Sequence, residues 1–350
     1  MRRRHILLSY AILLLLIAGC GRNEEKLFPF EDFRRLEGRA VCEDMLVGRP
    51  SRLTVIDSLL IFSDKLDDRL VTIANPKSGE SRRAVFTGRG PGEMMMIRRI
   101  YRDDDGRIFL FDINTHKIIS YSADKSYQEL LSPNTRLGET AFSYDEVPYE
   151  VITFGDGYIA NGNFDGRQFS LLDGDGRSTG YFGVYPGNND DVGSGDAFFM
   201  KNQTLMAVKP DQSRFAAAGY SNDQLVFYKA EKSGIPQKAR EYFSYDSNIE
   251  VMGNEHGTRA MHTPETRSAY LCLYPTDKYL YASYNGRTIA EMTVPDASKD
   301  IYILKFDWDG KFIEGYVVGN IDDFAVDETA GRLYAFVYED GDNILTAYDL

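Results

Sequence analysis

A six-fold recurrence of one short pattern constrains the fold of this chain more than any other feature. Each copy is a tetrad of aromatic and aliphatic residues, usually preceded by a turn-forming cluster, and the tetrads begin at Leu59, Phe109, Tyr158, Phe215, Tyr279 and Leu333. Successive copies lie 50, 49, 57, 64 and 54 residues apart. A period of this length is typical of propeller blades or solenoid turns.

A second strand pattern follows each tetrad. Alternating segments begin at Val71, Ile118, Phe169, Leu225, Ile303 and Ile344, and most end in a polar turn. Such pairs predict the hairpins of a half-buried antiparallel sheet, and helical periodicity is absent. Six units in about 290 residues leave room for four short strands each, which is the content of a propeller blade.

The last unit is one strand short, because its second segment ends at Leu350. Upstream of the first unit, Arg39–Val47 has a strand pattern but no blade of its own. Pairing this strand with the last unit would remove two open sheet edges. The sequence therefore predicts an all-β fold, a six-bladed β-propeller whose N-terminal strand closes the last blade. Two stacked β-sandwich domains are the main alternative.

The N-terminus has the pattern of an export signal. Arg2, Arg3 and Arg4 precede an apolar run from Ile6 to Ile17, which is short for a membrane-spanning helix and typical of a secretory signal. The run ends in Ile17-Ala18-Gly19-Cys20, which resembles the bacterial lipobox. We expect a lipoprotein signal peptide at 1–19, lipidation of Cys20, a tether at 20–37 and the propeller at 38–350. An ordinary signal peptide that happens to contain a cysteine is the alternative.

Charge narrows the choice of partners. Removal of residues 1–19 leaves 37 basic and 53 acidic residues, a net charge of −16. This charge opposes sequence-independent binding to nucleic acid, which depends on Lys and Arg at phosphates. We expect no nucleic-acid partner and a membrane contact through the lipid anchor only. The acidic Glu24-Glu25 after the cysteine resembles the surface-export signal of Bacteroidetes lipoproteins, so we expect an outer-membrane lipoprotein, with surface exposure left open.

One junction between repeats carries a specific resemblance. Gly88-Arg89-Gly90-Pro91-Gly92-Glu93 is followed by a strand and by Asp105–Asp112, as at the blade junctions of NHL-type propellers. Together with the lipobox, this form resembles the TolB-like six-bladed propeller lipoproteins of Bacteroidetes. The resemblance implies the same fold and no established reaction. Glycine and proline suit a chain reversal, so the junction predicts a turn, with Arg89 and Glu93 facing a ligand as the alternative.

The long polar stretch Asp246–Ser268 accounts for the largest step between repeats. Long insertions often carry function. We expect a lid on one propeller face, in which Asn254, His256, Arg259 and His262 offer hydrogen-bond donors to a ligand. An exposed loop without a role is the alternative. Tyr185 is a further candidate, because an aromatic residue in a loop is free to stack on a ligand.

Catalytic and metal motifs are weak. The fragment around Ser221 has Asp223 where a nucleophile elbow needs its second glycine. Asp173 begins no complete calcium loop, and the two histidines of the insertion have neither a third histidine nor a cysteine nearby. We therefore predict no catalytic residue, no metal site and no cofactor. Cys42 and Cys272 are expected to be unpaired, since they lie on different strands.

The favoured function is a non-enzymatic binding or scaffold module for a peptide, a glycan or a partner protein, and we expect a monomer. A metal-dependent lactonase or lyase, with its site at the mouth of the central channel, is the alternative. Convergence of three or more carboxylate, Asn or His side chains from different blades would favour the enzyme.

Overall fold

The computed structural model describes residues 27–350 except 148, 190–195, 232–233, 255–256, 296 and 340, and the side chains of 196, 254 and 257–259 are also left undescribed. Chain contacts divide the protein into two units, Met1–Glu31 and Asp32–Leu350. A short 3₁₀ helix, η1 (Phe30–Asp32), lies at the boundary, and all the named strands belong to the second unit.

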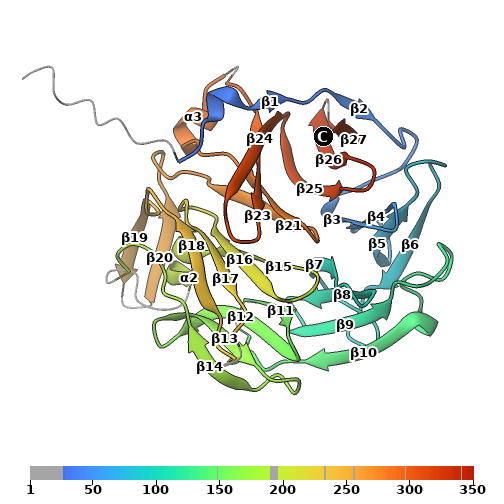
Figure 1. Ribbon diagram of the computed structural model, residues 1–350, viewed down its shortest axis with the longest axis horizontal. Coiled ribbons are helices and arrows are strands. Elements are labelled where there is room, and N and C mark those ends of the chain that lie inside the picture. Colours follow the sequence, from blue (N-terminus) through green and yellow to red (C-terminus); the bar gives the residue numbers. More distant parts are fainter. Residues whose placement is uncertain are drawn as a thin grey trace, which may run out of the picture. The chain divides into compact units, whose positions relative to one another are not determined.

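Most strands of the second unit form six largely antiparallel sheets arranged as blades around a central axis (Figure 1). Blade 1 contains β3 (Ser51–Ile56), β4 (Leu59–Ser63), β5 (Arg69–Ala74) and β6 (Ser81–Phe86). Blade 2 contains β7 (Ile97–Arg102), β8 (Arg107–Asp112), β9 (Lys117–Ser122) and β10 (Arg136–Ala141). Blade 3 contains β11 (Glu150–Phe154), β12 (Gly157–Phe164), β13 (Arg167–Leu172) and β14 (Ser178–Phe182).

The second half of the ring follows the same plan. Blade 4 contains β15 (Thr204–Val208), β16 (Arg214–Gly219), β17 (Leu225–Lys229) and β18 (Gln237–Tyr242). Blade 5 contains β21 (Tyr270–Pro275), β22 (Tyr279–Tyr284), β23 (Ile301–Asp307) and β24 (Phe312–Val318). Blade 6 contains β25 (Ile321–Asp327), β26 (Arg332–Glu339), β27 (Asp342–Asp349) and the N-terminal β2 (Gly38–Ala40). The predicted six-bladed all-β propeller is confirmed.

The repeated tetrads form the second strand of every blade, from β4 to β26, and the alternating segments form the third. Neighbouring blades cover both faces of these strands, so their residues are almost all buried. Phe62 of blade 1 and Phe336 of blade 6 pack edge to face, with ring centroids 4.9 Å apart. Aromatic contacts of this kind seal the boundary where the ring closes.

The ring closes through the N-terminal strand, as predicted, but the strand is shorter than Arg39–Val47. β2 pairs antiparallel with β27, from Gly38 opposite Tyr348 to Ala40 opposite Thr346. Cys42 then adopts a positive φ of 54°, and Met45 donates a backbone hydrogen bond to it. This turn directs the chain away from the sheet edge and ends the pairing.

The chain joins the fold before residue 38. β1 (Arg34–Arg35) pairs in parallel with β24, at the outer edge of blade 5. The backbone N–H of Leu36 then donates to the carbonyl of Val317, and Leu36 is buried. Arg34, Arg35 and Leu36, which the sequence analysis assigned to the tether, therefore pack on the propeller.

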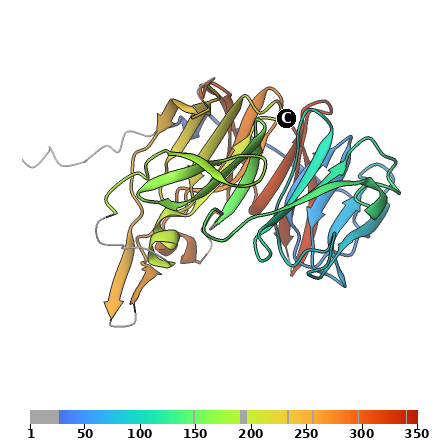
Figure 2. The ribbon, with the colours of Figure 1, turned by 90° about the horizontal axis from the view of Figure 1, so that it is seen from below.

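Insertions between strands account for the longer repeat steps. A hairpin of β19 (Ile249–Asn254) and β20 (Gly257–His262) lies between blades 4 and 5 and projects away from the ring (Figure 2). Two short helices, α2 (Asp196–Asn202) and α3 (Ile289–Thr293), were not predicted, because five to seven residues are too few to show helical periodicity. A second 3₁₀ helix, η2 (Pro133–Thr135), precedes β10. Among the described helices, none has the length and apolar character needed to cross a membrane.

Candidate binding site in the central channel

The innermost strands of four blades carry a β-bulge near their first residues. The register shifts between Ser51 and Thr54 in β3, Ile97 and Arg99 in β7, Tyr270 and Cys272 in β21, and Ile321 and Phe324 in β25. A bulge bends its strand and re-aims the side chain of the extra residue. Arg52 lies within the first bulge with a φ of 58°, a left-handed conformation that is uncommon for arginine.

These strands surround a cavity of about 540 Å³ inside the channel. Five blades line it with residues from the same level of the ring: Arg52 from β3, Arg99 from β7, Leu205 from β15, Cys272 from β21 and Asp323 from β25. The mouth of the cavity is formed by the turns that join first to second strands, including residues 57–58, 103–104 and 275–277. The cavity is therefore a product of the whole ring.

Three arginines surround a single buried carboxylate from blade 3. The Nε of Arg99 lies 2.5 Å from Oε1 of Glu150, whose residue is only 2% exposed. Burial disfavours the charged carboxylate, but attraction by Arg99, Arg98 and Arg52 and the hydrogen bond from Arg99 outweigh it. The pKa of Glu150 therefore lies below its ordinary value.

A second carboxylate of this cluster is already engaged by short-range donors. Asp323 accepts hydrogen bonds from the Cys272 thiol at 3.0 Å, from its neighbour Phe324 N at 2.9 Å and from Leu53 N at 3.1 Å. Burial, followed by the Asp323 carboxylate, raises the pKa of Cys272 well above its ordinary value. Of this cluster, Arg52, Arg99 and Asp323 line the cavity.

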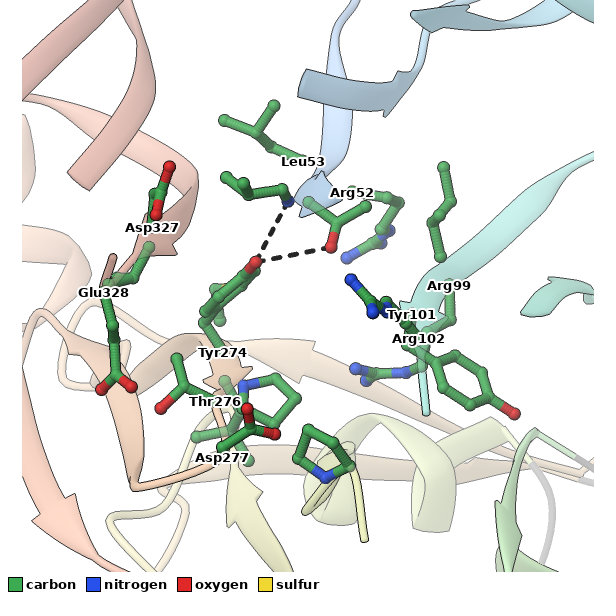
Figure 3. Close-up of a pocket in the computed structure, with 18 of the residues that line it drawn as sticks. Arg52, Leu53, Arg99, Tyr101, Arg102, Tyr274, Thr276, Asp277, Asp327 and Glu328 are labelled. Carbon is green, nitrogen blue, oxygen red and sulfur yellow. Dashed lines mark hydrogen bonds between the residues drawn. The ribbon is translucent and has the colours of Figure 1, made fainter. Parts of the chain in front are cut away.

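The wall opposite the arginines is acidic. Figure 3 shows the guanidinium groups of Arg52, Arg99 and Arg102 pointing into the cavity, with Asp277, Asp327 and Glu328 across it. Arg102 is paired with Asp57 at 3.0 Å, near the surface. Tyr274 stands between the two walls, and its hydroxyl accepts from Val55 N at 3.1 Å and lies 3.5 Å from Thr54 Oγ1. The cavity thus has a cationic side and an anionic side.

A second cavity of about 480 Å³ lies at the base of the β19–β20 hairpin. Its lining includes His262, Arg267, Arg287 and Lys299, and Leu271 lines both cavities. Arg267 donates to the carbonyl of Gly286 at 3.1 Å, and Arg287 donates to Asn285 Oδ1 at 2.7 Å and to the carbonyl of Asp300 at 3.1 Å. These side chains are held against the wall by neutral acceptors.

Comparison with known protein families matches residues 30–329 to the model of the TolB-like 6-blade propeller-like family. The chain belongs to this family. The match covers nearly the whole ring, from the N-terminal segment to the turn after β25, and agrees with the observed six blades.

Solved structures share the fold of this TolB-like chain at low sequence identity. A protein described as exported from Bacteroides fragilis aligns with a TM-score of 0.50 and 14% identity, covering 90% of this chain and 94% of the other. A member of the duf4221 family from Bacteroides vulgatus aligns with a TM-score of 0.52 and 10% identity, covering 91% and 97%. No curated protein sequence matches the chain significantly. At these identities the likeness concerns the fold alone.

The glycine-rich junction of this TolB-like chain is a blade junction, as predicted, between β6 and β7. Glu93 Oε2 accepts from Gly90 N at 2.9 Å, and a Cβ at Gly88 would lie 1.9 Å from that same oxygen. Glu93 therefore closes the turn, while Arg89 is exposed. Neither residue lines the two cavities described above.

Tyr185 is not the free loop aromatic that the sequence suggested. It is 7% exposed, its hydroxyl donates to the carbonyl of Gly162 at 2.8 Å, and its ring packs edge to face on Phe198. Burial raises the pKa of its hydroxyl. The residue is part of the packing between blade 3 and α2, because its apolar ring gains more from burial than from exposure in the loop.

The residues of the predicted lid are spread along the β19–β20 hairpin. Asn254 pairs with Gly257 at its tip, Arg259 pairs with Met252 in its middle, and His262 lies at its base, where it lines the second cavity. His256 lies outside the described residues. Among these four residues, the described side chain is that of His262, and it lies at a cavity.

The channel residues Arg52, Arg99 and Glu150 were not singled out from the sequence. The sequence does contain a signal for them, namely a fixed spacing from the tetrads. One residue of each blade lies 7 to 10 positions before its tetrad: Arg52, Arg99, Glu150, Leu205, Cys272 and Asp323. Within the described part of the chain, no three His, Cys, Asp or Glu side chains lie close enough to hold a metal ion. Carboxylates of blades 1, 2, 5 and 6 line the channel cavity together with Arg52, Arg99 and Arg102, without forming such a cluster.

Proposed function

We propose that this chain is a lipid-anchored, non-enzymatic binding module whose ligand occupies the channel cavity. The observation that carries the proposal is the cavity of about 540 Å³, lined by charged side chains from several blades. Small-molecule sites are typically concave spaces of roughly 300–1,000 Å³ with a few converging polar groups. A peptide, a glycan or a segment of a partner protein fits this description.

Binding is tested on the soluble chain starting at residue 21, by thermal shift with a panel of tripeptides and of neutral oligosaccharides. Thr329→Trp places a bulky ring at an exposed position of the cavity mouth. Lys125→Trp, at an exposed turn outside both cavities, is the matched control. We expect at least one panel member to stabilise the wild type and the Lys125 variant but not the Thr329 variant. Equal shifts in all three proteins would place binding elsewhere.

The anchor is part of the same proposal. A lipid on Cys20 would hold the propeller at the outer membrane, and the distance to the bilayer would be set by the residues before β1. Cys20→Ser removes the acceptor thiol, so labelled palmitate should be absent from this variant and present in the wild type. Palmitate on the variant would contradict the lipobox assignment.

A further inference from the structure

The channel contains guanidinium groups without a matching acceptor. No described residue forms a hydrogen bond or an ion pair with the side chain of Arg52, which lines the cavity. Arg99 uses its Nε on Glu150, and no described residue accepts from its two terminal nitrogens. Both groups point into the same space (Figure 3).

The unused guanidinium donors of Arg52 and Arg99 make an anion the expected occupant of this wall. A charge taken out of water is costly unless a partner neutralises it. Asp323 already accepts three hydrogen bonds, and Glu150 Oε1 accepts from Arg99. Glu150 Oε2 is buried and accepts no hydrogen bond from a described residue, so Arg52 attracts Glu150 without donating to it. A carboxylate of a ligand could accept hydrogen bonds from both Arg52 and Arg99, because guanidinium groups offer the paired donors that a carboxylate prefers.

The opposite wall specifies the other end of the ligand. Asp277 is exposed on the rim, and its side chain forms no hydrogen bond or ion pair with a described residue. Glu328 accepts only from the Tyr281 hydroxyl, at 3.3 Å, among the described residues. Carboxylates in this position would attract an ammonium group, so the ligand carries both signs of charge.

We infer that the channel binds the free C-terminal carboxylate of a short peptide at Arg52 and Arg99, with the peptide's amino group toward Asp277 and Glu328. This inference rests on the proposed function and narrows its ligand from peptide, glycan or partner protein to a zwitterionic peptide. A neutral glycan would leave both charged walls unmatched.

The experiment uses isothermal titration of the soluble chain from residue 21 with triglycine, triglycine amide and N-acetyl-triglycine at low salt. We expect triglycine to bind, and the amide to bind at least about tenfold more weakly, because it lacks the carboxylate that accepts charged hydrogen bonds. N-acetylation should weaken binding less, since the acidic rim is more exposed to solvent.

Variants separate the two walls. Arg52→Gln should weaken triglycine at least about tenfold, and Arg52→Lys should fall between it and the wild type, because lysine keeps the charge but loses the fork. Arg89→Gln, at an exposed arginine outside both cavities, is the matched control and should bind like the wild type. Asp277→Asn should weaken triglycine but leave N-acetyl-triglycine unchanged.

Two results overturn the inference: equal binding of triglycine and its amide, or unchanged binding by a folded Arg52→Gln variant. If an oligosaccharide binds the wild type in the thermal-shift panel and triglycine does not, the inference fails while the proposed function survives. If neither class of ligand binds, both fail. The melting temperatures of the variants establish that each is folded.

Discussion

Arg99 of blade 2 and Glu150 of blade 3 form a buried ion pair inside the channel, with Nε 2.5 Å from Oε1 and side-chain exposures of 15% and 3%. The pair joins two blades at the axis, where the inner strands leave space for the cavity. Next to it, the backbone N–H of Thr153 donates to the Tyr101 hydroxyl at 3.0 Å across the same boundary. Polar contacts therefore hold the blades together where the apolar core ends.

Glu150→Gln should destabilise the propeller by about 3 kcal/mol, because removing one partner of a buried pair leaves the other charge uncompensated. Urea unfolding at pH 7 measures the effect. The matched control is Glu314→Gln, which breaks the 2.7 Å pair with Lys305 at a carboxylate that is 46% exposed. That control should cost less than about 1 kcal/mol. Equal losses in the two variants would contradict a special role for the channel pair.

The same residue predicts a pH dependence. Burial opposes ionisation of Glu150, but the surrounding arginines depress its pKa below the ordinary 4.5. A depressed carboxyl pKa contributes stability above the unfolded-state value, and this contribution is lost as the pH falls through the folded-state value. The difference in unfolding free energy between wild type and Glu150→Gln should be constant from about pH 8 to pH 6 and shrink below about pH 4.5. A difference that grows on acidification would reverse the assigned sign.

Ring closure can be tested at Gly38. A Cβ at this position would lie 2.6 Å from Thr346 Cγ2 and 2.8 Å from the Tyr348 ring, both on β27. Gly38→Val should therefore lower stability by about 2 kcal/mol through overpacking, measured as a lower thermal midpoint. Gly319→Val is the control, since a Cβ there meets nothing within 4 Å. If Gly38→Val melts no lower than the control, β2 does not close the ring as described.

The thiols provide a probe of the channel. Cys42 and Cys272 are free, as predicted, so two thiols should titrate in the denatured soluble chain. In a Cys42→Ser background, Asp323→Asn should speed the reaction of Cys272 with a thiol reagent at pH 8 severalfold, because burial and the Asp323 carboxylate both raise the pKa of this thiol. Asp322→Asn, its exposed neighbour, should change the rate little. A slower reaction of the Asp323 variant would contradict the hydrogen bond.

Much of the fold could be predicted because its signal is local and repeated. In β8 and β12, for example, the tetrads at Phe109 and Tyr158 lie between two neighbouring strands and two neighbouring blades, so their apolar character is plain in the sequence. In the same way, the last unit has only three strand patterns of its own, and this predicted that the N-terminal strand completes it. Its length was overestimated, because the turn at Cys42 depends on a positive φ that no residue pattern there indicates.

The sequence by itself determined the number of blades, the two middle strands of each blade and the way the ring closes, since these follow from period and alternation. Only the tertiary structure decided the site. Arg52, Arg99, Glu150 and Asp323 look like ordinary strand residues and lie far apart in the sequence. Bulges at the ends of the inner strands aim Arg52 and Asp323 at one axis, and such bulges arise from the fit between blades rather than from the local sequence. Tyr185 was predicted to be a free binding residue, but the tertiary structure buries it, because its ring packs against Phe198 of α2.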